Sequence, residues 1–131
     1  MKVYGIVAEY NPFHNGHKFQ IDEIRKKAGD CAIVSVMSGN YVQRAETAVM
    51  SKYARAKAAL LGGVDLVLEL PMPYAISSAE RFAYSSVHIL NSLGAVTDIS
   101  FGSECGGISL LQKAEEALYD ENVKVRCWIW Q

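Results

Sequence analysis

The hydrophobic residues of this chain fall into short apolar runs that alternate with stretches of helical spacing. Four runs are rich in β-branched and aromatic residues, which predicts buried strands at residues 2–9, 31–37, 64–70 and 98–101. The intervening stretches predict helices at residues 16–28, between Thr47 and Gly62, from Ser78 to Leu93, and at residues 109–119. Strands and helices therefore alternate along the chain.

The spacing within two of these helices predicts which face each one buries. Between Thr47 and Gly62 apolar residues recur every three or four positions. Residues 77–80, Ser-Ser-Ala-Glu, have the pattern of an N-terminal cap for the next helix. The predicted buried faces are Val49, Tyr53, Ala56 and Leu60 in the first helix, and Ala79, Phe82, Ala83, Val87, Leu90 and Leu93 in the second. Lys52, Arg55 and Lys57 are expected to form a solvated face.

Alternating elements with nearly continuous apolar strands are typical of a parallel sheet covered on both faces. We therefore expect an α/β fold, a Rossmann-like parallel sheet with helices on both faces, in one domain over residues 1–131. No internal repeat or low-complexity linker interrupts it. Residues 127–130, Cys-Trp-Ile-Trp, are compatible with packing on this domain or on another one.

The composition narrows the class of protein. Half of the 131 residues are hydrophobic and 21% are charged, the balance of a soluble globular domain. The net charge of -1 makes this segment a poor clamp for nucleic acid. Cys31, Cys105 and Cys127 are odd in number and widely spaced, which favours reduced thiols. With no signal-peptide pattern and no run long enough to cross a bilayer, we expect a cytoplasmic location and no membrane partner.

Candidate chemistry concentrates where the predicted strands end. Parallel α/β sheets bind ligands beyond the carboxyl ends of their strands. Glu69 closes the third strand, and a role in the site or as a paired, partly buried carboxylate fits that position equally well. The polar, small and imidazole-bearing residues at these ends are Asn11, His14, Gly16 and His17, then Ser38, Gly39, Asn40, Gln43 and Arg44, then Pro71, and finally Gly102, Ser103 and Glu104.

Residues 14–17, His-Asn-Gly-His, lie where the first strand turns into the first helix. Amide groups at a helix start attract an anion, and Gly16 leaves room for a phosphate to approach the backbone. Two imidazoles three positions apart lie on neighbouring turns, so both can donate to one phosphate. The two commonest phosphate loops, GxxxxGK[ST] and GxGxxG, are absent. A phosphate site is therefore predicted here.

These residues resemble the signature of the HIGH-motif nucleotidyltransferase superfamily. Within it, the sequence is most similar to the bacterial tRNA(Met) cytidine acetate ligases. Five segments carry this resemblance in order and extend to about Gly106. They are residues 5–17 (GIVAEYNPFHNGH), 37–44 (MSGNYVQR), 65–71 (DLVLELP), 78–83 (SAERFA) and 101–104 (FGSE).

The resemblance implies a specific reaction. Members of that family use ATP to adenylate acetate, then transfer the acetyl group to N4 of the wobble cytidine in elongator tRNA(Met). The same likeness implies that His14, His17 and Arg44 are catalytic residues, and that ATP and Mg²⁺ are the cofactors. The ATP-binding residues that it implies are Val7, Ala8, Glu9, Tyr10, Asn11, Pro12, Phe13, His14, Asn15, Gly16, His17, Lys18, Phe19 and Gln20, with Ser38, Gly39, Gln43 and Gly102.

The chain departs from the family pattern in two places. The family usually has Gln-Arg-Gly-Glu-Pro-Ala where residues 43–48 are Gln-Arg-Ala-Glu-Thr-Ala. If the glycine position needs a positive φ, Ala45 would cost on the order of 1 kcal/mol. Family members also continue well beyond residue 131. We therefore expect a truncated, N-terminal nucleotide-binding portion, with the tRNA-binding region absent and the oligomeric state left open.

Three alternatives remain at this stage. The chain could adenylate another small substrate, such as a phosphorylated cofactor precursor, or bind nucleotide without catalysis. His14 and His17 could instead have a structural role at the helix start. A zinc site is disfavoured because it needs three or four ligands and Cys31 begins a buried strand, so no resident metal is expected.

Overall fold

The computed structural model describes residues 1–102, and the predicted helix at 109–119, the terminal Trp-rich segment, Cys105 and Cys127 lie outside them. The described elements follow the predicted alternation of strands and helices. Their order is β1 (Lys2–Ala8), α1 (Asn15–Ala28), β2 (Cys31–Ser38), the short 3-10 helix η1 (Gln43–Ala45), α2 (Lys52–Leu61), β3 (Leu66–Leu70), α3 (Met72–Ala75), α4 (Ala79–Ser92) and β4 (Asp98–Ser100).

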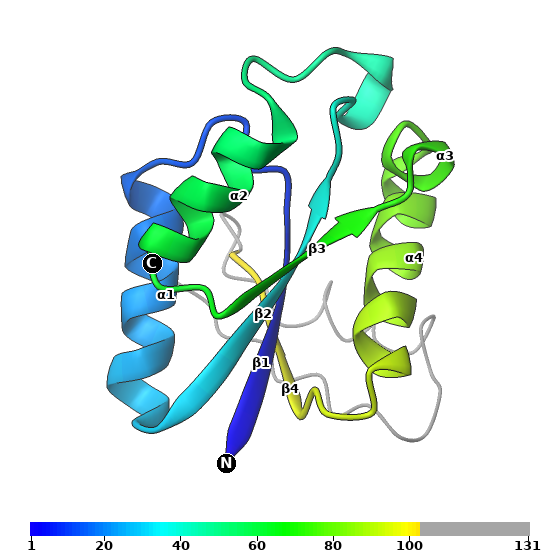
Figure 1. Ribbon diagram of the computed structural model, residues 1–131. Helices are drawn as coiled ribbons and strands as arrows, with labels where there is room; N and C mark the ends of the chain where they lie inside the picture. Colours follow the sequence, from blue (N-terminus) through cyan, green and yellow to red (C-terminus); the bar gives the residue numbers. More distant parts are fainter. Residues whose placement is uncertain (103–131) are drawn as a thin grey trace.

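The four strands form one parallel sheet in the order β3-β2-β1-β4. The chain moves outward from β1 through β2 to β3, then crosses to the other side of β1 to add β4 (Figure 1). This reversal of direction places a switch point between β1 and β4, where sheets of this kind bind ligands. The predicted α/β fold is therefore confirmed.

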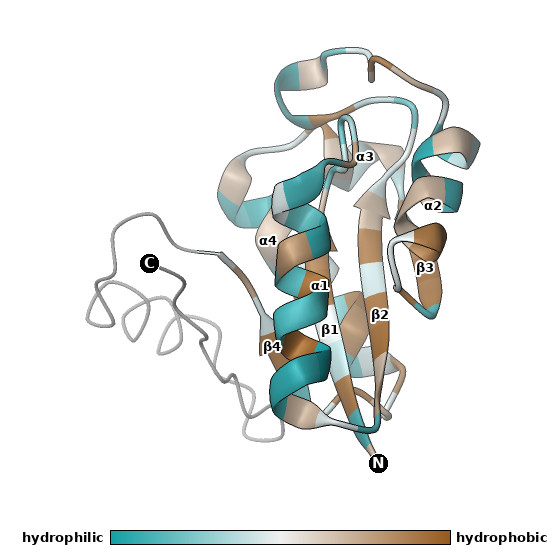
Figure 2. Ribbon diagram, turned by 90° about the vertical axis from the view of Figure 1, so that its left-hand side faces the viewer, coloured by the Kyte–Doolittle hydropathy of each residue, from teal (hydrophilic) through white to brown (hydrophobic). Residues whose placement is uncertain are grey.

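Helices cover both faces of the sheet, and each face has its own hydrophobic core. Helices α1 and α2 pack on one face and α3 and α4 on the other (Figure 1). Figure 2 shows a largely hydrophilic surface on the side of α1 that faces away from the sheet. The first core contains Tyr4, Ile6, Tyr10, Ile21, Ile24, Cys31, Ile33, Met37, Ala59 and Val64; the second contains Val34, Val36, Leu70, Ala75, Phe82 and Leu90.

Local capping explains where the helices begin. Ser51 and Ser78 are the N-caps of α2 and α4, and their hydroxyls accept main-chain N–H bonds from Ala54 and Arg81. The predicted cap at residues 77–80 is thus confirmed. Helix α1 ends with three consecutive basic residues before Gly29, which has a positive φ of 68°.

The predicted buried face of α2 is correct only at Ala56, which packs against the first core. Tyr53 is 77% exposed and Leu60 is 46% exposed, whereas Arg55 and Ala59 are the buried residues of this helix. Val49, which precedes the helix, is also exposed. The helix is turned so that small Ala59 meets the sheet and Arg55 reaches main-chain carbonyls, an arrangement that hydrophobic periodicity cannot detect.

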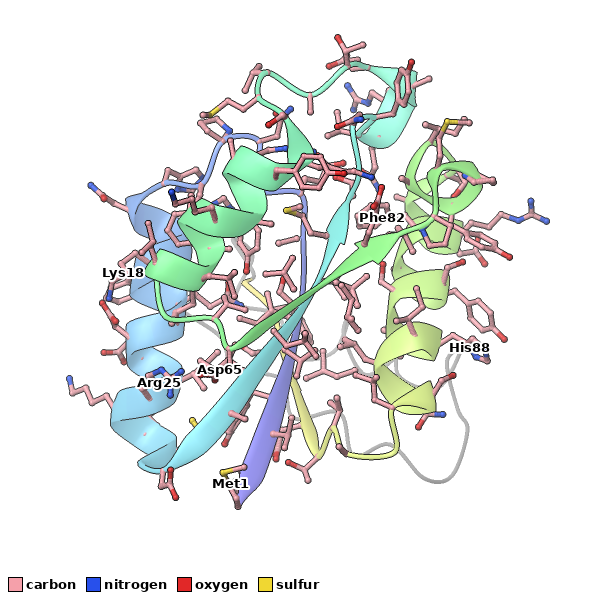
Figure 3. The ribbon with its side chains drawn as sticks, in the orientation of Figure 1. Met1, Lys18, Arg25, Asp65, Phe82 and His88 are labelled. Atoms are coloured by element: carbon pink, nitrogen blue, oxygen red, sulfur yellow. The ribbon has the colours of Figure 1, made fainter. Side chains whose placement is uncertain are left out.

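The predicted face of α4 is correct only in part. Phe82 and Leu90 are buried as expected, and Figure 3 shows Phe82 pointing from α4 toward the sheet. Ala79, Ala83 and Leu93 are exposed instead, while Ser86 is fully buried. Ser86 tolerates burial because its hydroxyl donates to the Phe82 carbonyl at 2.8 Å.

Candidate functional site

The segment between β1 and α1 brings two histidines to the start of α1. Tyr10, only 1% exposed, anchors this segment in the core with a positive φ of 48°. A cis peptide bond joins Asn11 and Pro12 two residues later. His14 then takes the N-cap position of α1, with extended backbone angles. The carboxyl end of β1 and the amino end of α1 therefore meet at the predicted position.

His14 and His17 form a reciprocal cap. The His14 Nδ1 atom accepts the Gly16 N–H at 3.1 Å, and the His17 Nδ1 atom accepts the His14 N–H at 3.2 Å. The two rings stack with their centroids 3.8 Å apart and an interplanar angle of 29°. The two imidazoles therefore lie together at the start of α1, as predicted. The capping box orients both rings, and the spacing of the two histidines did not predict this cap.

This arrangement determines which ring nitrogens can act on a ligand. Because each Nδ1 accepts a main-chain N–H, the proton of each neutral imidazole lies on Nε2. Burial, with a further contribution from His14, lowers the pKa of His17 from 6.5 to about 4. His17 is therefore neutral at pH 7. Each ring therefore has an Nε2–H donor that takes no part in the helix cap.

Two aromatic rings contact the His17 imidazole. Tyr10 contacts it edge-on at a centroid distance of 4.9 Å, and Phe13 lies 5.5 Å away. The Phe13 ring in turn occupies the space above Gly62 at the end of α2, where a Cβ atom would come within 2.4 Å of Cζ. Tyr10 and Phe13 are thus core and supporting residues, which restricts the rotamers of His17.

Gly16 is required by the His14 ring. A Cβ atom at this position would lie 2.9 Å from His14 Cε1. The space that Gly16 leaves open is therefore filled by an imidazole, and its amide is already bonded to that ring. A phosphate at this corner would meet the Nε2 edges of the pair before the Gly16 amide.

The second predicted wall follows β2. Ser38 is fully buried, and Gly39 lies beneath the Glu69 carboxylate, where a Cβ would come within 2.3 Å of Oε1. That carboxylate pairs with Lys52 Nζ at 2.7 and 2.9 Å, so the predicted pairing of Glu69 is confirmed, but the side chain is exposed and not partly buried as predicted. Gln43 donates its main-chain N–H to Glu9 Oε1 at 2.7 Å, which joins this wall to the segment after β1.

Arg44 and Ala45 adopt left-handed backbone angles, with φ of 64° and 59°. The position where the family usually has glycine therefore does have a positive φ in this chain.

We expect Ala45→Gly to raise the free energy of unfolding by up to about 1 kcal/mol, because glycine relieves the strain of the positive φ. The conformational entropy that glycine adds to the unfolded chain reduces this gain. Urea denaturation checks this, with Ala48→Gly as the control that should not stabilise; an equal or lower stability for Ala45→Gly would contradict it.

The remaining predicted residues have varied surroundings. Lys18 pairs with Asp22 one turn along α1, and Gln20 Nε2 donates to Ser100 Oγ at 3.1 Å, which ties α1 to β4. Phe19 is 55% exposed, and Gly102 is exposed just beyond β4. Val7 and Ala8 are half-buried and pack against the second and the first core, respectively. The implied ATP-binding residues therefore include some that pack inside the fold and others whose side chains are exposed.

Three further findings concern the described residues. Residues 1–102 contain no group of three His, Cys, Asp or Glu side chains arranged to hold a metal ion. A groove of about 660 Å³ lies over α3 and α4, lined by Pro71, Tyr74, Arg81, Tyr84, Ser85, His88 and Ile89, and of the residues predicted at the strand ends it includes only Pro71. Within the same range no helix is long and apolar enough to span a membrane.

Arg55 is the residue that sequence reasoning missed. It was expected on a solvated face, yet it is 1% exposed and bonds to main-chain carbonyls of Glu9, Gly39 and Met50. Lys52 was also expected to be solvated and instead pairs with Glu69. The predicted α2 face also left out Ala59, which is fully buried.

Comparison with known families assigns the class of the protein. A family model described as HIGH Nucleotidyl Transferase matches residues 1–128. The chain therefore belongs to the HIGH nucleotidyltransferase family. A solved protein described as a lipopolysaccharide core biosynthesis protein from Thermoplasma volcanium shares the fold, with a TM-score of 0.59 at 15% identity.

Particular relatives are much more similar. The tRNA(Met) cytidine acetate ligase of Caldicellulosiruptor saccharolyticus is 56% identical over 113 residues, 86% of this chain and 28% of that protein. The ligase of the same name from Thermosipho africanus is 50% identical over 93% of this chain and 29% of its own length. The crystal structure of Thermotoga maritima TmcAL bound with alpha-thio ATP superposes with a TM-score of 0.83 at 48% identity, covering 92% of this chain and 29% of that one. The chain thus spans less than a third of the length of these relatives.

Proposed function

We propose that this chain binds ATP at the switch point between β1 and β4, with His14 and His17 holding the phosphates. The single observation that carries the proposal is the stacked, capped imidazole pair with both Nε2–H groups unused by the cap. Hydrogen bonds from fixed donors to a phosphate that gains charge in the transition state are typically worth about 3 kcal/mol each. The similarity to a structure that holds an ATP analogue supports the choice of nucleotide.

We further infer the reaction that the whole protein performs. An acetate oxygen attacks the α-phosphorus of ATP, the bond to the β-phosphate oxygen breaks, and acetyl-adenylate and pyrophosphate form. The N4 amine of the wobble cytidine in elongator tRNA(Met) then attacks the acetyl carbonyl, which releases AMP and a proton. The names of the relatives and the residue pattern at positions 5–17 support this assignment.

The chain's own residues would bind and orient the phosphates. His17 donates as a neutral group because its pKa is about 4, and His14 donates from the ring stacked on it. Arg44, exposed on η1, would contact a phosphate from the opposite wall. Mg²⁺ bound together with ATP would neutralise charge on the phosphates that these residues hold.

The proposal is tested by calorimetric titration with ATP, together with pyrophosphate exchange into ATP in the presence and absence of acetate. We expect saturable ATP binding, and exchange that depends on acetate. Exchange that requires a different acceptor would replace the acetate assignment within the same family. Binding without exchange would limit this chain to a nucleotide-binding portion, and no binding at all would refute the phosphate site.

A further inference from the structure

We propose that Arg55 is a positioning residue, which holds the two loops of the phosphate site in one fixed geometry. The loops are residues 9–14 after β1 and residues 39–51 after β2. The expected effect of Arg55 on ATP binding rests on the proposed function. The geometry that Arg55 holds is argued from contacts within the described residues alone.

Arg55 is placed to join three segments at once. Its side chain leaves the middle of α2 and is 1% exposed. Nη1 donates to the Glu9 carbonyl at 2.5 Å, Nη2 donates to the Gly39 carbonyl, and Nε donates to the Met50 carbonyl at 3.2 Å. A planar guanidinium spreads its donors over three nitrogens in a fixed fork, so it reaches three separate carbonyls, whereas the three donors of an ammonium all lie on one nitrogen.

Burying a cation here is costly, which indicates that it does more than fill space. Burial lowers the pKa of Arg55, and the Glu9 and Glu69 carboxylates oppose that shift. The guanidinium nevertheless keeps its charge at neutral pH. An apolar side chain would avoid the desolvation cost but would leave the carbonyls of Glu9 and Gly39 at the ends of β1 and β2, and that of Met50 before α2, without these donors.

The bonded carbonyls transmit this constraint toward the imidazoles. In a trans peptide unit, the C=O and the following N–H point in opposite directions. Holding the Glu9 carbonyl toward Arg55 therefore fixes the peptide plane from which Tyr10 starts, and Tyr10 packs edge-on against the His17 ring. The same reasoning fixes the Gly39–Asn40 peptide at the start of the opposite wall.

Two further bonds join the same loops beside Arg55. Glu9 Oε1 accepts the Gln43 N–H at 2.7 Å, and Asn11 Oδ1 accepts the Val49 N–H at 2.8 Å. The loops therefore move as one unit if Arg55 is intact. Without it, the loops are joined by these two bonds and, at their bases, by the β1–β2 pairing that extends to Ala8 and Met37.

The chain provides a matched control at the other end of the sheet. Arg25 also bonds to main-chain carbonyls, with Nη1 to Cys31 at 3.1 Å and Nη2 to Gly63 at 2.7 Å. It pairs in addition with Asp65, and Figure 3 shows the two side chains adjacent at the end of α1 that lies away from His14. Arg25 thus has the same chemistry without contact to either loop.

The test compares Arg55→Lys with Arg25→Lys, each measured by hydrogen exchange of the free chain and by calorimetric titration with ATP. Lysine keeps the charge and most of the volume, so both variants are expected to fold, and Arg55→Met serves as a second variant. We expect Arg55→Lys to raise exchange in residues 9–14 and 39–51 about 10-fold or more, with residues 2–8 still protected, and to weaken ATP binding about 10-fold. Arg25→Lys should change neither.

The outcomes separate the inference from the proposed function. A folded Arg55→Lys variant whose loops exchange as slowly as in the parent chain would overturn the inference. Equal changes for Arg25→Lys would also overturn it, because they would reflect general destabilisation. If the parent chain binds no ATP, the proposed function fails, while the exchange data alone still decide whether Arg55 holds the loops.

Discussion

Replacing His14 by Asn, or His17 by Gln, is expected to weaken ATP binding about 10-fold to 100-fold while helix α1 stays intact. Asn is among the best N-cap residues, and Gln at the third helical position can bond back to the N-cap amide as His17 does. Each substitution therefore removes an Nε2–H donor but retains the cap. Circular dichroism would report the helix, and calorimetry would report the ATP affinity.

The third histidine of the described chain supplies the control. His88 lies on the outer side of α4, far from the start of α1 (Figure 3). His88→Asn should leave ATP affinity unchanged. If His14→Asn and His17→Gln both bind ATP as tightly as the parent chain, the phosphates are not held by the imidazoles, whatever the affinity of the chain for nucleotide.

Leu90→Ala is expected to destabilise the domain by about 3 kcal/mol, because a fully buried side chain would leave a cavity. Leu90 packs directly over Gly5 in β1, where a Cβ would come within 2.8 Å of Leu90 Cδ1. Gly5→Ala alone should cost about 1–3 kcal/mol through overpacking. Urea denaturation of both single variants measures these losses.

The double variant tests whether α4 sits on β1 in this register. An alanine at position 5 would occupy part of the space that Leu90→Ala vacates, so the double variant should lose at least about 1 kcal/mol less than the sum. Rescue should be incomplete because Val96 also approaches position 5, at 3.2 Å. Leu93→Ala, on the same helix but 41% exposed, should change stability by less than about 0.5 kcal/mol. Strict additivity would contradict the observed packing.

Local sequence was sufficient for the elements and for the place of the imidazoles. The apolar runs located β1 to β4, and the Ser78 cap and Gly29 terminus marked helix ends, because these signals depend on residues a few positions apart. The spacing of His14 and His17 likewise placed both rings at one helix start. The alternation of elements also implied the parallel sheet with helices on both faces.

Only the tertiary structure decided the orientation of α2 and the partners of its cations. Arg55 is buried and Tyr53 exposed because the carbonyls of Glu9 and Gly39, distant in sequence, converge beneath this helix. Glu69 and Lys52 are likewise paired through the packing of α2 on β3. A hydrophobicity pattern indicates which residues avoid water, but it carries no information on where main-chain carbonyls need donors. In α2, the hydrogen bonds of Arg55 to such carbonyls determine the orientation of the helix, although Tyr53 and Leu60 are left exposed.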